Sequence, residues 1–113
     1  MYDRCCDLIV ETFKKVGTDP YMGQGLYPAF VRAGLAPLMG LRALIGGPMG
    51  DLRPVDLISG LGVTMAPVME AHGLIGPDEI DAASYQERMR EEVGRLGSVV
   101  IGRFEIGAWS RLP

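Results

Sequence analysis

Few side chains of this sequence have the chemistry of catalysis or metal binding. They are the adjacent thiols Cys5 and Cys6 and a single histidine, His72. No Cys-x-x-Cys spacing and no second histidine is present, so we expect reduced thiols and no metal site. No nucleophile elbow surrounds any serine or cysteine, which leaves a Ser–His–Asp or Cys–His site open without pointing to one. The sequence therefore assigns no catalytic residue.

Two glycine clusters raise the question of a nucleotide cofactor, because a glycine-rich turn that opens a helix can hold phosphates. Gly17, Gly23 and Gly25 follow an amphipathic helical segment, whereas a dinucleotide loop follows a strand. Gly60 and Gly62 follow a short apolar run, but a methionine stands where such a loop has its third small residue. We therefore expect no cofactor-binding residue here, and we expect a helix at the second cluster.

A third chemical feature is the abundance of methionine. Met65 and Met69 are one helical turn apart, and Met49 lies in the turn Gly46–Asp51. Thioethers adapt to irregular shapes, so Met49, Met65 and Met69 are candidate substrate-lining residues, with core packing as the alternative. The turn itself has no Lys-Ser or Lys-Thr after it, which excludes a P-loop and leaves a flexible turn or a mobile lid beside a ligand.

The composition limits the classes of protein to which the chain can belong. Its 113 residues fit one domain, with 48% hydrophobic residues and a net charge of −3. No strong basic face is present, so nucleic acid is not an expected partner. No apolar run is long enough for a bilayer and no signal peptide is recognisable, so we expect a cytoplasmic protein with no membrane partner.

The hydrophobic periodicity predicts mainly helices. Gly17, Gly34, Gly73 and Gly97 are placed to end them, and Asp19–Pro20 is placed to begin one. Internal prolines should kink or break two of them. The predicted helices are 3–16, 20–33 (with Pro28), 54–72 (with Pro67) and 85–96, with a further helix start at 75–80.

Two segments read as strands, the second half of 35–45 and the segment 98–109. Two strands separated by about 50 residues of helix do not make a stable sheet alone. Their natural place is the edge of a larger sheet. The sequence therefore predicts an incomplete, mostly helical α/β fold.

Three stretches carry a resemblance that accounts for this incompleteness. They are YDRCCDLIVETFKKVGTDPYMGQGLYPAFVRAGL, MAPVMEAHGLIGPDEID and SVVIGRFEIGAWSRLP. In this order and spacing, the chain resembles the C-terminal portion of class I S-adenosylmethionine-dependent methyltransferases. The first stretch resembles the helix, turn and helix after the fifth strand, the second a proline-containing helix, and the third the last strand.

The resemblance implies a truncated methyltransferase domain that spans 1–113 as a single unit. Residues 38–45 and 99–109 would be an antiparallel pair at the edge of a Rossmann-like sheet, and 46–97 a helical insertion beside the substrate. The family uses S-adenosylmethionine and small-molecule substrates. It holds its cofactor upstream of the matched segments, so this chain alone is expected to bind none and to be inactive.

Two alternatives of other classes stay open. One is a non-enzymatic interaction or dimerisation module, in which exposed strand edges allow self-association. The other is a small helical ligand-binding domain that uses the Met65–Met69 face.

Overall fold

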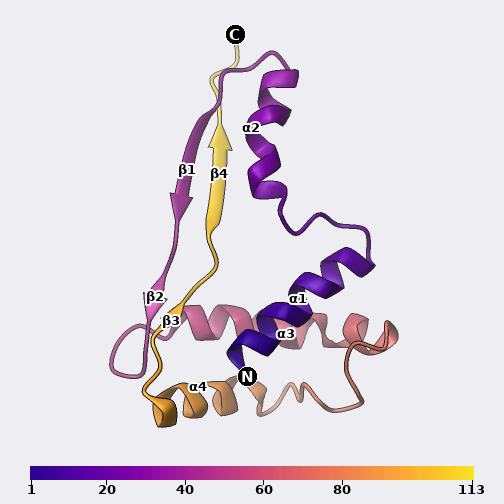
Figure 1. Cartoon of the computed structure of the whole chain (residues 1–113), viewed down its shortest axis with the longest axis vertical. Helices are drawn as coiled ribbons and strands as arrows, with labels where there is room; N and C mark the ends of the chain where they lie inside the picture. The colour runs from indigo at the N-terminus through magenta and orange to yellow at the C-terminus, as the bar shows by residue number, and fades with distance from the viewer.

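The computed structural model describes all 113 residues. Four helices and two antiparallel pairs of strands, β1 with β4 and β2 with β3, make up a mixed α/β structure. Figure 1 shows them in the order α1 (Tyr2–Lys15), α2 (Met22–Arg32), β1 (Leu38–Arg42), β2 (Ile45–Gly46), α3 (Arg53–Ala71), α4 (Tyr85–Leu96), β3 (Val100–Ile101) and β4 (Glu105–Trp109). The predicted mixed α/β class is confirmed at this level, and no closed sheet is present.

Helices α1, α3 and α4 pack together with the β2–β3 pair, and we call this part the helical body. Each helix contributes fully buried apolar side chains, among them Ile9 from α1, Ile58 and Met69 from α3, and Met89 from α4. Burying a side chain of this size contributes about 1.5–3 kcal/mol. The apolar faces of these amphipathic helices thus form one core in the helical body.

The other part, which we call the arm, consists of α2, β1 and β4. β1 and β4 pair from Leu38 opposite Trp109 to Arg42 opposite Glu105. Helix α2 lies against β4 (Figure 1). None of the residues in α2, β1 or β4 is buried, so the arm has no core of its own.

An unpaired break divides the strands into two ladders. The β1–β4 register ends where Arg42 faces Glu105, and the β2–β3 register begins where Ile45 faces Ile101. Between these points lie residues 43–44 on one side and 102–104 on the other, and none of them belongs to a strand. Gly102 begins the longer side, and its N–H donates a 2.7 Å hydrogen bond to the opposite segment. The two predicted strands do pair antiparallel, but as two short ladders rather than one.

The helices end at the glycines that the sequence predicts, whereas the internal prolines do not break them. Gly17, Gly34, Gly73 and Gly97, predicted to end helices, all have positive φ. Helices α2 and α3 are continuous across their internal prolines, so the prolines do not break them, and the alternative of a kink stays a prediction. Each proline removes one helical hydrogen bond, and the remaining turns keep their own.

Two predicted helix starts need correction. Helix α2 begins at Met22, because the Asp19 carboxylate accepts the Tyr21 N–H at 2.8 Å and forms a turn before the helix. The segment 75–80 forms turns instead of a helix start. In that segment Glu79 accepts the Gly76 N–H at 3.2 Å, and the next helix begins only at Tyr85.

The molecule is extended for its length. Its radius of gyration is 16.8 Å, whereas a compact chain of this length has about 13 Å. Its accessible surface is 7305 Å², against about 6,100 Å² for a compact monomer of this mass. None of its helices is long and apolar enough to cross a membrane.

Candidate functional site

The structure does not bring the three candidate methionines together. Met49 is 99% exposed in the turn after β2, whereas Met69 is 0% exposed in the core of the helical body. Met65, one turn before Met69, is half-buried and packs against that core. Their role beside a substrate stays a prediction, and in this chain Met69 serves the core.

The thiols and the histidine do not form a catalytic pair. Cys5 is buried, and its thiol donates to the Ile58 carbonyl at 3.4 Å. Burial raises the pKa of both Cys5 and Cys6, so both thiols are neutral at neutral pH. His72 is exposed at the end of α3, and its imidazole makes no hydrogen bond. The structure therefore offers no Ser–His or Cys–His arrangement.

Two of the glycine-rich segments, Gly60–Gly62 and Gly46–Asp51, lie inside α3 and directly before it. Gly60 and Gly62 lie inside α3, which confirms the helix predicted at this cluster. The turn Gly46–Asp51 does precede α3, but the Asp51 carboxylate already accepts the Arg53 N–H at 2.9 Å. A carboxylate of the chain thus occupies the place that a phosphate would take at this helix start.

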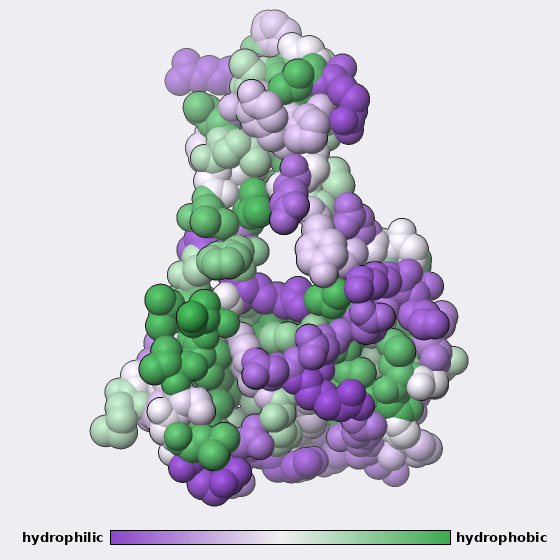
Figure 2. Space-filling model, in the orientation of Figure 1, coloured by the Kyte–Doolittle hydropathy of each residue, from purple (hydrophilic) through white to green (hydrophobic).

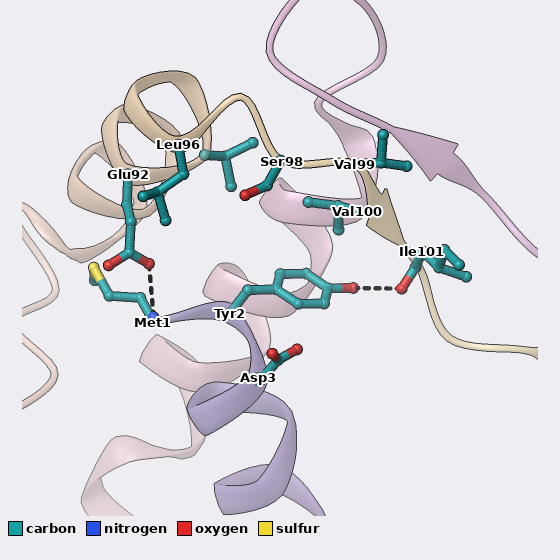
Figure 3. Close-up of a pocket in the computed structure, with 10 residues that line it drawn as sticks. Met1, Tyr2, Asp3, Glu92, Leu96, Ser98, Val99, Val100 and Ile101 are labelled. Carbon is teal, nitrogen blue, oxygen red and sulfur yellow. Dashed lines mark hydrogen bonds and ion pairs between the residues drawn. The ribbon is translucent and has the colours of Figure 1, made fainter.

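One pocket lies where the start of α1 meets the end of α4 and β3, with a volume of about 480 Å³. Figure 3 shows two polar pairs in it, Met1 with Glu92 and Tyr2 with Ile101. The terminal ammonium of Met1 pairs with Glu92 at 2.6 Å, and the Tyr2 hydroxyl donates to the Ile101 carbonyl at 3.2 Å. Burial is the largest cause that raises the pKa of Tyr2 to about 12, which keeps this hydroxyl a donor. These groups are satisfied without a ligand.

A second cavity, of about 630 Å³, lies between the β3–β4 segment and the α1–α2 segment. Arg103 is the only charged residue in its wall, and its guanidinium forms no ion pair. Sequence reasoning did not single out Arg103. The sequence signal that could have pointed to it is its position as the lone cation in the apolar run 98–104. The cavity itself could not be predicted, because its other wall comes from helices distant in sequence.

The arm presents apolar side chains to solvent. Leu41 is 67% exposed and Trp109 is 54% exposed, although both belong to the β1–β4 ladder. Each strand of this ladder pairs on one side only. An uncovered ladder of this kind is a surface on which another chain or segment can pair.

No protein-family model, no curated protein and no solved structure matches this chain. What the chain can do is therefore inferred from its geometry and from the sequence resemblance.

Proposed function

We propose that this chain is the substrate-side C-terminal segment of an S-adenosylmethionine-dependent methyltransferase that acts on a small molecule. The observation that supports the proposal is the antiparallel pairing of β1 with β4. The resemblance assigns these segments to the last two strands of a Rossmann-like sheet. Helices α3 and α4 lie between them in the chain, as expected for an insertion over 46–97.

In this proposal the cofactor belongs to residues outside the present chain. Methyl transfer depends mainly on aligning the acceptor in line with the methyl group. The segment would contribute to that alignment by forming one wall of the substrate site. It would be inactive without the cofactor-binding half.

The coding sequence immediately upstream of Met1 tests the proposal. We expect an in-frame segment with a strand, a glycine-rich loop and a second strand that ends in Asp or Glu. An in-frame stop codon directly upstream would contradict this. Calorimetry with the 113-residue chain is the second test, since micromolar binding of S-adenosylmethionine to it would also contradict the proposal.

The extended shape favours a second candidate function, an interaction module that pairs with a second copy of itself. The accessible surface exceeds that of a compact monomer by about 1,200 Å². A standard protein interface buries about 800 Å² per partner. One interface of standard size over the arm would therefore remove about two thirds of this excess.

Light scattering after size exclusion separates the two candidates. Self-association predicts a dimer of the 12.2 kDa chain that Leu41→Glu in β1 dissociates. Leu57→Glu is the matched control, because Leu57 is also exposed but lies on α3. A well-folded wild-type monomer at high concentration would reject the dimer.

A further inference from the structure

The cavity between the strands and α2 has the size of a ligand site. Figure 2 shows an opening through the molecule at this place, between the strands and the α1–α2 connection. Its volume of about 630 Å³ falls within the range of about 300–1,000 Å³ that is usual for small-molecule pockets. Tyr21 and Phe104 contribute aromatic rings, and Val10, Ile101 and Ile106 contribute aliphatic side chains.

The charge in this cavity is not balanced by the protein. Of the eleven Lys and Arg residues, five form ion pairs with carboxylates within 4 Å. Five of the other six are exposed to water, where an unpaired charge costs little. Arg103 is the sixth, and it is half-buried. A partly buried cation without a counter-ion is unfavourable, which points to a missing partner.

The hydrogen bonds of Arg103 also leave one of its donors without a partner. Its Nη2 donates to the Cys6 carbonyl at 3.1 Å, which fixes the guanidinium against α1. Its Nε is buried and has no hydrogen-bond partner. The nearby Cys6 thiol is neutral, because burial raises its pKa, so it does not offset the charge. Because this donor has no partner in the protein, a shift of the guanidinium toward an anion in the cavity would cost no hydrogen bond at Nε.

The rest of the wall favours an anion as well. No Asp or Glu lines the cavity. Gly23 and Gln24 belong to the first turn of α2, whose N-terminal end carries a partial positive charge. The Gln24 side chain adds an uncharged amide that can donate a hydrogen bond.

We propose that this cavity binds a small anion, a carboxylate or a phosphate ester, that carries an aromatic or apolar group. Arg103 would be the counter-ion, and Tyr21 and Phe104 would flank the apolar group. The proposal goes beyond the methyltransferase assignment and does not depend on it, since every residue involved lies in this chain.

Titration calorimetry with the 113-residue chain tests the site, with benzoate, phenyl phosphate and neutral benzyl alcohol as probes. We expect saturable binding of at least one anion, and binding of benzyl alcohol at least about tenfold weaker. The preferred anion tells whether the site is built for a carboxylate or a phosphate. Failure of both anions to bind at millimolar concentration would overturn the proposal.

Two substitutions assign the binding to this cavity. Arg103→Gln should lower the affinity for the anion about tenfold or more, whereas Arg95→Gln, an exposed cation on α4, should leave it unchanged. Gln24→Glu keeps Arg103 but places a carboxylate in the wall, and should abolish binding even if Arg103→Gln fails to fold. Anion binding that survives in a folded Gln24→Glu variant would overturn the assignment.

Discussion

At the scale of single residues, a glycine of α3 packs closely against a cysteine of α1 in the core. A Cβ atom at Gly62 in α3 would lie 2.6 Å from the Cys5 Sγ atom in α1. Cys5 is fully buried and its thiol donates to the Ile58 carbonyl, so it has no open space into which to turn. The glycine that resembled part of a cofactor loop is therefore explained by helix packing.

This contact predicts different effects of the same substitution at two glycines of α3. Gly60→Ala should stabilise the protein by about 0.5–1 kcal/mol, because a Cβ there meets nothing within 4 Å and alanine favours the helix. Gly62→Ala should be less stable than Gly60→Ala by about 1–3 kcal/mol, the usual cost of overpacking. Urea unfolding followed by circular dichroism measures the difference. Equal stability of the two variants would show that α1 moves aside without cost.

At the scale of elements, the sequence predicts those whose determinants are local. The spans of α1 and α4 follow from their own apolar periods and from Gly17 and Gly97. The break between the two ladders does not follow from such local signals, because it depends on which residues of the opposite segment face Gly102. The Arg103 cavity was missed for the same reason, since its walls come from α1, α2 and the β3–β4 segment.

The connection between α3 and α4 has no helix, and a contact with α1 holds it in place. Glu79 in this connection pairs with Arg4 of α1 at 2.8 Å and accepts the Gly76 N–H. The hydrogen bond from Arg4 is the largest cause that lowers the pKa of Glu79 below its usual value. A carboxylate whose pKa is lowered in the folded state stabilises the fold while it is ionised.

This contact predicts that acid destabilises the protein partly through Glu79. The stabilisation is present above the unfolded pKa of about 4.3 and is lost as the pH falls through the lower folded value. Glu79→Gln should therefore reduce the loss of stability between neutral and acidic pH, measured by urea midpoints at a series of pH values. The control is Glu91→Gln, since Glu91 is exposed and forms no ion pair. A pH profile of Glu79→Gln identical to that of the wild type would contradict this role.

At the scale of the whole molecule, the two parts differ in what stabilises them. The helical body holds the thirteen buried residues of the hydrophobic core, and no residue of the arm's helix and strands is buried. Local opening is easiest where few apolar contacts must be broken. The arm should therefore open without unfolding the body.

Amide hydrogen exchange tests this difference directly. In dilute protein, amides of β1, β4 and α2 should exchange through local opening, and those of α1, α3 and α4 much more slowly through global unfolding. Equal protection of the arm and the body would mean that the arm is stabilised by contacts other than buried apolar surface.

Repeating the measurement at high protein concentration then tests for a second copy on the arm, because pairing adds protection to β1 and β4 by mass action. Protection that does not change with concentration would leave the missing half of a larger sheet as the better candidate to cover the arm.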